Sequence, residues 1–120
     1  MRGDQAITRS SWSAVEITAA GRSLDKILES FGDVRDEQDL TSDEALIFLA
    51  VGRLGLTPST MGVAVHPVTC LNVSELLKIP TETVRRKAGR LVERGFFVRT
   101  TRGLLVKRVD EWRRLAEKFV

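Results

Sequence analysis

The sequence predicts a mainly α-helical domain that carries one small β-hairpin. Three observations support this class. Apolar residues recur at helical spacing behind candidate capping boxes, a tight turn separates two short predicted helices within residues 72–94, and two β-prone segments follow. A chain of 120 residues suits one domain with one hydrophobic core. We therefore exclude a large two-domain enzyme or regulator.

The first predicted helix is long and amphipathic. Ser13 and Glu16 fit a capping box, and the apolar spacing behind them predicts a helix from about Trp12 to Phe31. Its continuous apolar stripe favours packing against a partner along most of its length. The acidic stretch 32–39 is expected to be a solvated linker.

The second predicted helix is the most buried one. Thr41 and Glu44 form another capping box, and the apolar run 45–51 follows, with an end expected near Gly52 to Gly55. Residues 55–69 are rich in Gly, Pro, Thr and Ser, which is typical of a loop, and Val68 to Leu71 is compatible with a short strand.

The segment from Asn72 to Gly95 carries the pattern of two short helices joined by a tight turn. Asn72 to Glu75 is a third candidate capping box, Pro80 ends that helix, and Thr81 is placed as the N-cap of the next one. Gly95 ends the second helix. One face of it is apolar and the rest is polar or basic, the sequence form of a helix-turn-helix; the apolar positions are Val84, Ala88, Leu91 and Val92.

The C-terminal part is expected to hold a hairpin and a last helix. Residues 96–100 and 104–107 are β-prone and flank Thr101-Arg102-Gly103, which places an Arg near the hairpin tip. Apolar residues at helical spacing from Val109 to Phe119 predict a short helix with Asp110 as its candidate cap. A helix of about a dozen residues is marginal alone, so its aromatic face must dock on something.

The net charge of +3 conceals a strongly basic block. Residues 1–77 carry a net charge of −5, residues 78–108 carry +8, and residues 109–120 are neutral. Clustered Lys and Arg favour a polyanionic partner because they release condensed counterions from phosphates, although a solvated basic face is the alternative. The basic members are Lys78, Arg85, Arg86, Lys87, Arg90, Arg94, Arg99, Arg102, Lys107 and Arg108.

The residue inventory argues against an enzyme, a metal site and a cofactor. The chain has one His, His66, and one Cys, Cys70, which excludes an internal disulfide and cannot complete a zinc site. No glycine-rich phosphate loop and no nucleophile-base pair are visible. No apolar run is long enough for a membrane span and no signal peptide is recognisable, so we expect a cytoplasmic protein.

Residues 73–87, then Leu91 to Phe97, then the short hairpin together resemble the bacterial winged helix-turn-helix transcriptional regulators. They look like the pattern shared by the GntR, MarR and ArsR groups, in which Thr-Val-Arg opens the recognition helix and Leu-x-x-x-Gly ends it. The resemblance covers about residues 41–108. The metal-sensing Cys pair of the ArsR group is missing, and the effector domain of the GntR group has no room.

The resemblance implies three segments and a homodimer on double-stranded DNA. Residues 1–40 and 109–120 would serve dimerisation or docking, and residues 41–108 would be the winged helix-turn-helix domain that binds a pseudo-palindromic operator. The predicted dimer contacts are Trp12, Leu24, Ile27, Leu28, Phe31, Trp112, Leu115 and Phe119.

Within the helix 81–94, physical chemistry assigns different roles to different positions. A helix N-terminus attracts phosphate, so Thr81 and Thr83 are placed at the DNA backbone. Arg86 is the best candidate for a bidentate guanine contact, and Glu82 for accepting from a cytosine amino group. Phosphate, base or groove contacts on the helix and the hairpin are expected for Thr81, Glu82, Thr83, Arg85, Arg86, Lys87, Arg90, Arg99 and Arg102.

Two other function classes stay open at this stage. The first is a winged-helix module that uses the basic block against an acidic protein or an RNA. The second is a small-molecule sensor with a pocket between the first helix and the 45–51 helix, although no convergent polar residues mark such a pocket and no effector is identifiable.

Overall fold

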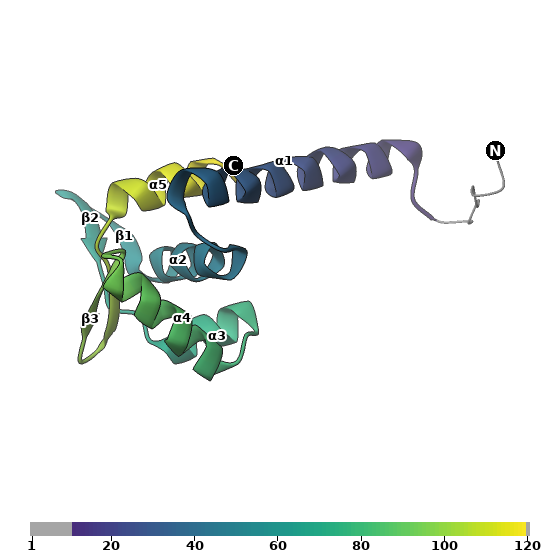
Figure 1. Cartoon of the computed structure of the whole chain (residues 1–120). Helices are drawn as coiled ribbons and strands as arrows, with labels where there is room; N and C mark the ends of the chain where they lie inside the picture. Colours follow the sequence, from purple (N-terminus) through teal and green to yellow (C-terminus); the bar gives the residue numbers. More distant parts are fainter. Residues whose placement is uncertain (1–10, 120) are drawn as a thin grey trace.

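A computed structural model describes residues 11–119, and these residues form a mainly helical chain with two antiparallel hairpins (Figure 1). The expected mainly α-helical class with a small hairpin is thus confirmed, and a second hairpin is added. In chain order the elements are α1 (Ala14–Gln38), α2 (Ser42–Gly55), β1 (Leu56–Ser59), β2 (Gly62–Val65), α3 (Cys70–Leu77), α4 (Thr81–Glu93), β3 (Phe97–Thr100), β4 (Gly103–Val106) and α5 (Val109–Glu117).

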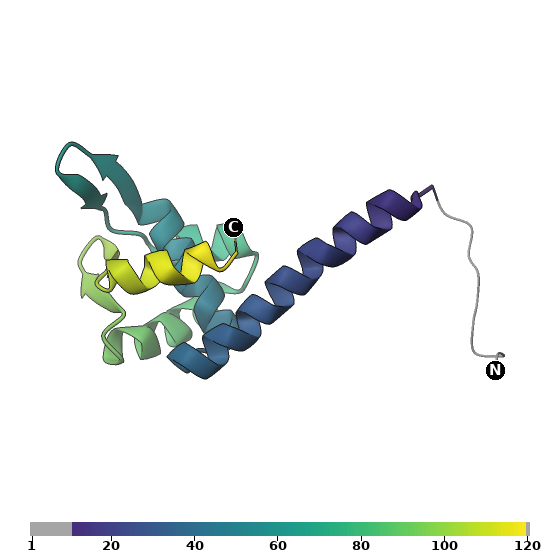
Figure 2. The same ribbon diagram turned by 90° about the horizontal axis from the view of Figure 1, so that it is seen from above.

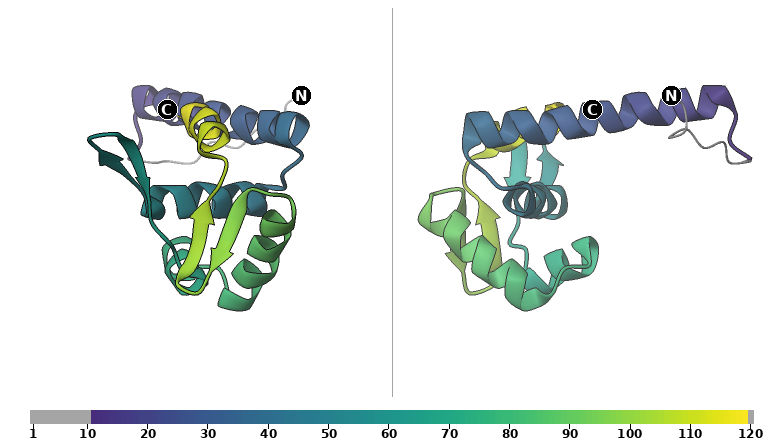
Figure 3. Two further views of the ribbon diagram at one scale, coloured as in Figure 1. Left: turned by 90° about the vertical axis from the view of Figure 1, so that its left-hand side faces the viewer. Right: turned by 45° about the vertical axis from the view of Figure 1, so that its right-hand side comes forward.

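The elements are stacked in three levels. Figures 1 and 3 show α1 and α5 along one side of the molecule, α2 in the middle, and α3, α4 and the tip of the β3–β4 hairpin at the opposite side. The N-terminal half of α1 projects beyond this body with no other element beside it (Figure 2). The fold therefore separates a projecting helix from the helix pair that follows the turn.

The start of α1 is as predicted and its end is not. The Ser13–Glu16 capping box is formed in both directions. The helix does not stop at Phe31 but runs to Gln38, so the prediction of a linker over residues 32–39 is wrong. Val34 is buried there, and the Arg94 guanidinium donates to the carbonyl oxygens of Gln38 and of the next residue. Tertiary contacts thus stabilise a helix end that local sequence does not favour.

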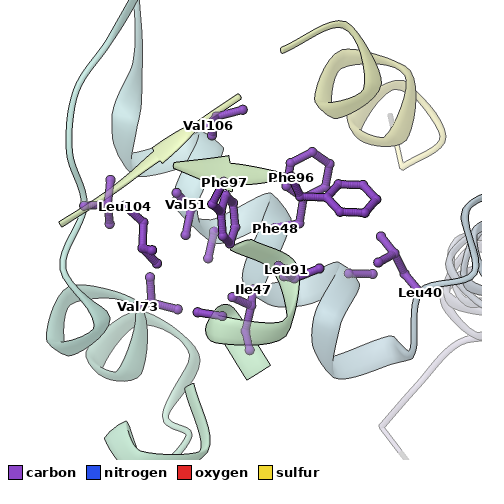
Figure 4. Packing of buried hydrophobic residues seen from close by; sticks show 14 of the residues in the cluster. Leu40, Ile47, Phe48, Val51, Val73, Leu91, Phe96, Phe97, Leu104 and Val106 are labelled. Atoms are coloured by element: carbon purple, nitrogen blue, oxygen red, sulfur yellow. The ribbon is translucent and has the colours of Figure 1, made fainter. Parts of the chain in front are cut away.

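The core surrounds α2, whose Thr41–Glu44 capping box is also formed. Residues from α2, α3, α4 and the β3–β4 hairpin meet around Phe48, which makes edge-on contact with Phe96, 5.2 Å between ring centroids. Figure 4 shows this packing. The labelled members are Leu40, Ile47, Phe48, Val51, Val73, Leu91, Phe96, Phe97, Leu104 and Val106, all nearly inaccessible to solvent.

The segment predicted as a loop holds the β1–β2 hairpin instead. Its register pairs Leu56 with Val65 and Ser59 with Gly62, which leaves a two-residue loop. Most of its residues are exposed, so the sequence lacks the alternation of buried and exposed positions that signals a strand. This explains why composition alone predicted a loop.

The second hairpin has the predicted tip. β3 and β4 pair from Phe97 with Val106 to Thr100 with Gly103. Val68 forms a single antiparallel bridge to Leu104. Cys70 and Leu71 belong to α3, so the prediction of a short strand from Val68 to Leu71 is wrong beyond that bridge. A Cβ at Gly103 would lie 2.5 Å from the Val68 carbonyl oxygen, and its φ is +138°. The hairpin therefore requires glycine at this position.

The last helix, α5, packs against the body and α1. Its N-cap is Arg108 and no side chain caps it, so the prediction that Asp110 caps the helix is wrong. The indole of Trp112 lies against Gly52 of α2, and its Nε1–H donates to the Leu49 carbonyl oxygen (3.3 Å). The Phe119 ring meets Phe31 of α1 edge-on at 5.1 Å. The aromatic face of α5 therefore docks within its own chain.

Candidate nucleic-acid interface

The turn between α3 and α4 is fixed by one serine. The Ser74 hydroxyl donates to the Ile79 carbonyl oxygen (2.5 Å) and accepts from the Thr81 hydroxyl (3.1 Å). Lys78 ends α3 in the left-handed conformation with φ 57°. Pro80 is the N-cap of α4, so the prediction that Thr81 caps this helix is wrong because its hydroxyl is turned back to α3. This network sets the angle between the two helices.

The helix before the turn also begins earlier than predicted. Thr69, not Asn72, is the N-cap of α3, and its hydroxyl oxygen accepts from the Asn72 amide (3.1 Å). The Thr69 hydroxyl donates in turn to the Asn72 side-chain oxygen (2.8 Å). The capping box predicted for Asn72 to Glu75 is therefore wrong.

The N-terminus of α4 leaves backbone donors available. No side chain caps it, and the first helical hydrogen bond runs from the Val84 amide to the Pro80 carbonyl. The amides of residues 81–83 thus precede the regular hydrogen bonding of the helix. Thr81 and Glu82 are exposed and Thr83 is half-buried. These free donors and the positive end of the helix dipole form an arrangement that favours a phosphate.

The outer face of α4 carries Arg85 and Arg86, and both are exposed to solvent. Arg86 is exposed and has no ion-pair or hydrogen-bond partner for its side chain among residues 11–119. Arg85 pairs with Glu82 one turn earlier, and both side chains are mostly exposed. Such a solvated pair contributes little free energy, so both groups can exchange partners at small cost. Arg86 is the cation on this helix that is best placed for an external acceptor.

Two other predicted contact residues face α2. The Lys87 ammonium lies 3.6 Å from Asp43, and the Arg90 Nε lies 3.9 Å from Glu44, whose side chain is only 3% exposed. Burial alone would raise the pKa of Glu44, but hydrogen bonds with Thr41 and the charge of Arg90 outweigh it and lower that pKa. Lys87, whose side chain is mostly buried, therefore attaches α4 to α2, a role that sequence reasoning missed. Arg90 makes only a long contact with Glu44, and its side chain stays mostly exposed.

The β3–β4 hairpin adds two exposed arginines beside α4. An Arg99 guanidinium nitrogen lies 3.6 Å from where a Cβ at Gly89 would be, so this side chain lies against the C-terminal half of α4. Arg102 lies at the tip, where its amide donates to the Thr100 hydroxyl and that hydroxyl donates to the Gly103 carbonyl. Figure 3 shows the β3–β4 hairpin beside α4, so the elements that carry these exposed arginines are neighbours.

Two cations of the basic block serve the fold. Arg94 bonds the end of α1, and Arg108 donates to the carbonyl oxygens of Arg94 (2.7 Å) and Gly95 (3.2 Å). Both guanidinium groups lie over the Phe96 ring. The charge count of the sequence therefore overstates the number of cations that are available to a partner. The exposed cations of the basic block are Lys78, Arg85, Arg86, Arg90, Arg99, Arg102 and Lys107.

The predicted dimer residues fall into two groups. Leu115 is fully buried within the chain, and the other members from α5, together with Phe31, pack against the core. The other group, on or just before the projecting part of α1, is exposed: Trp12 (55%), Leu24 (57%), Ile27 (39%) and Leu28 (66%). The intrachain packing of Phe31, Trp112, Leu115 and Phe119 accounts for their apolar character without a second chain.

The structure provides no metal centre or membrane span within the residues it describes. No group of three His, Cys, Asp or Glu residues between 11 and 119 is placed to hold a metal ion. His66 instead bonds the Thr57 hydroxyl at 2.9 Å, across the β1–β2 hairpin, and Cys70 is a half-buried free thiol. None of the described helices is long and apolar enough to cross a bilayer.

No protein-family model, curated protein or solved structure matches this chain. Its function must therefore be inferred from its own geometry and charge.

Proposed function

We propose that this chain is a bacterial, cytoplasmic transcriptional regulator that binds double-stranded DNA in a sequence-specific manner. In this proposal residues 41–108 are a winged helix-turn-helix, α4 is the recognition helix, and the β3–β4 hairpin is the wing. The observation that carries it is the combination of an α4 N-terminus that no side chain caps with three exposed arginines on α4 and the adjoining hairpin. These are Arg86, Arg99 and Arg102. No catalytic role is assigned.

The chemistry of these groups matches the two kinds of contact that DNA offers. The free amides of residues 81–83 and the Arg85 side chain suit phosphate oxygens, which position a protein without reading sequence. Arg86 suits the O6 and N7 acceptors of guanine in the major groove. Arg102 at the hairpin tip suits the minor groove or its backbone. Lys87 is assigned to α2 and not to DNA. Arg90 is exposed on the same helix and stays among the proposed DNA contacts.

The proposal includes a homodimer formed through α1. The projecting part of this helix exposes Leu24 and Leu28, and an isolated helix of that length is marginally stable in water. A second copy would cover the stripe and bring two recognition helices to successive major grooves, about 34–36 Å apart. Phe31 already packs on Phe119, just after α5, so we place the contact on the part of α1 that precedes Phe31.

The test is selection of bound duplexes from a random pool, followed by affinity measurements on the enriched sequence. A palindromic motif with half-sites one helical turn apart is expected. Affinity should fall by roughly 0.9 log units per log unit of salt for each neutralised phosphate. An empty selection together with flat salt dependence would refute DNA recognition.

A pair of variants separates the two kinds of contact. Arg86→Ala should cost about 1–3 kcal/mol on the selected sequence and little on random DNA, which relaxes the preference. Arg85→Ala should weaken binding to all sequences about equally and reduce the salt slope. Equal losses on both DNAs for Arg86→Ala would contradict its assignment to a base.

The alternative is a module that binds an acidic protein or an RNA through the same cations. The exposed, weakly paired Arg85 and Glu82 are compatible with it because they present both charges to a partner. Recovery of one protein or RNA partner, combined with no enriched duplex, would favour this alternative.

A further inference from the structure

An apolar groove of about 350 Å³ lies between the β1–β2 hairpin and α5. Within the described part of the chain, Arg113 is the one charged residue that lines it, and its guanidinium pairs with Glu117 one turn later on α5. None of the lining residues belongs to the proposed DNA contacts, so the groove is open to a different role. Its apolar lining residues are Leu56, Pro58, Val63, Val109 and Trp112.

The hairpin that forms one wall of the groove has the composition of an interface. Residues 54–65 include no charged side chain, although 29% of the residues of the whole chain are charged. Met61 and Val63 are nonetheless exposed, Val63 to 55%. Exposed strands normally carry charges that keep other apolar surfaces away. An uncharged apolar surface of this kind marks a contact with another molecule.

The projecting half of α1 presents a second apolar surface of matching character. Ile17, Leu24 and Leu28 are exposed and share one side of the helix, since they are spaced seven and four residues apart. The same side continues to Phe31, whose ring packs on Phe119 just after α5. One apolar face of α1 therefore packs on its own chain at one end and is exposed at the other.

These two surfaces cannot meet within one chain. α1 is a continuous helix of 25 residues, and it projects away from the side of the body on which the β1–β2 hairpin lies (Figure 2). A second copy in the reverse orientation removes this obstacle, because its helix can run back toward the first hairpin. We infer that residues 14–28 of each chain lie in the groove between the β1–β2 hairpin and α5 of the other chain. The inference rests on the homodimer included in the proposed function and specifies the surface that receives α1.

A reciprocal contact of this kind allows modest surfaces to hold a dimer. Each chain contributes one helix face and one groove, so the complete interface consists of four surfaces. A stable interface buries at least about 1,200 Å² in total, which is about 300 Å² for each surface. Apolar patches of about 300–600 Å² are ordinary on single chains. The exchange also closes with twofold symmetry, so it does not grow into a filament.

Sedimentation equilibrium of the full chain, without DNA, tests the contact from the side of the groove. Val63→Asp places a charge in the groove and should raise the Kd of the dimer at least about a hundredfold, because the change occurs twice and a tenfold penalty at each contact multiplies. Val98→Asp is the matched control, since it makes the same exchange at an exposed valine of the β3–β4 hairpin, and should leave Kd unchanged. Circular dichroism checks that each variant is folded. An unchanged Kd for Val63→Asp, or equal losses for the two variants, would overturn the inference.

A mixture of two variants distinguishes this exchange from a contact between like surfaces. Leu24→Asp changes the helix face and keeps the groove, whereas Val63→Asp changes the groove and keeps the helix face. Their heterodimer contains one intact contact, so the mixture should associate about tenfold more tightly than either variant alone. A helix–helix or hairpin–hairpin pair gives no such rescue, and its absence would refute the reciprocal arrangement.

These measurements separate the groove from the wider proposal. A dimer that Leu24→Asp dissociates and Val63→Asp leaves intact would support the α1 interface and refute the groove as its partner surface. A wild-type chain that stays monomeric at millimolar concentration would refute both the groove contact and the homodimer. DNA recognition is decided independently, by the selection of bound duplexes.

Discussion

Replacing Gly52 with alanine should detach α5 from α2. A Cβ at Gly52 would lie 1.9 Å from Nε1 and 2.2 Å from Cε2 of Trp112, closer than non-bonded atoms approach. The indole would have to move, and its hydrogen bond to the Leu49 carbonyl oxygen would be lost. The contact between these helices thus depends on the absence of one side chain.

The expected cost follows from these contacts. Overpacking of a filled core costs about 1–3 kcal/mol, and loss of one hydrogen bond costs about 0.5–1.5 kcal/mol. Alanine offsets about 0.5–1 kcal/mol of this loss, because it has less backbone freedom than glycine in the unfolded chain and so loses less entropy on folding into a helix. We therefore expect a loss of about 2–3 kcal/mol in the free energy of unfolding. At roughly 4 °C per kcal/mol, the melting temperature should fall by about 8–12 °C.

Urea unfolding followed by circular dichroism measures the free energy of unfolding. Tryptophan fluorescence reports on Trp112, with a contribution from Trp12 that both variants share. Gly21→Ala is the matched control, since it makes the same exchange within a helix where a Cβ would meet nothing within 4 Å. The control should keep or raise stability and helicity. A Gly52→Ala variant as stable as the wild type would refute the docking of α5 described above.

Three further results are expected. Gly103→Ala should destabilise the β3–β4 hairpin by more than about 1 kcal/mol, because its Cβ would meet the Val68 carbonyl at a positive φ; urea unfolding measures it, and an unchanged midpoint would contradict it. The folded-state pKa of Glu44 is lowered, so its stabilisation is present above the unfolded pKa of about 4.3 and is lost as the pH falls through the folded pKa. Glu44→Gln should flatten the acid limb of a plot of stability against pH, and an unchanged slope between pH 5 and 3 would argue against this linkage. Leu24→Asp should shift sedimentation toward the monomer and leave the unfolding of the body unaltered; a persistent dimer would place the interface elsewhere.

The sequence determined the features that depend on neighbours within one or two turns. Ser13 and Thr41 begin their helices as predicted because a capping box is a local exchange of hydrogen bonds. Gly95 ends the run of α4, and its φ is +81°. The apolar face of α4 is buried because helical spacing fixes which side chains share a side.

Other features required contacts between residues far apart in the chain. The end of α1 at Gln38 depends on Arg94, which is 56 positions away. The β1–β2 hairpin has no buried face that would mark its strands in the sequence. Composition and periodicity carry no information about such long-range partners.

The candidate site shows the same division. The sequence alone predicted three features of this site, namely the basic block, the turn before α4 and an arginine at the hairpin tip. Only the tertiary structure decided that Lys87 pairs with an acid of α2, while Arg86 and Arg102 remain exposed. The physical reason is that charge is a property of each residue, whereas its availability depends on which opposite charges and carbonyl groups the fold brings within reach.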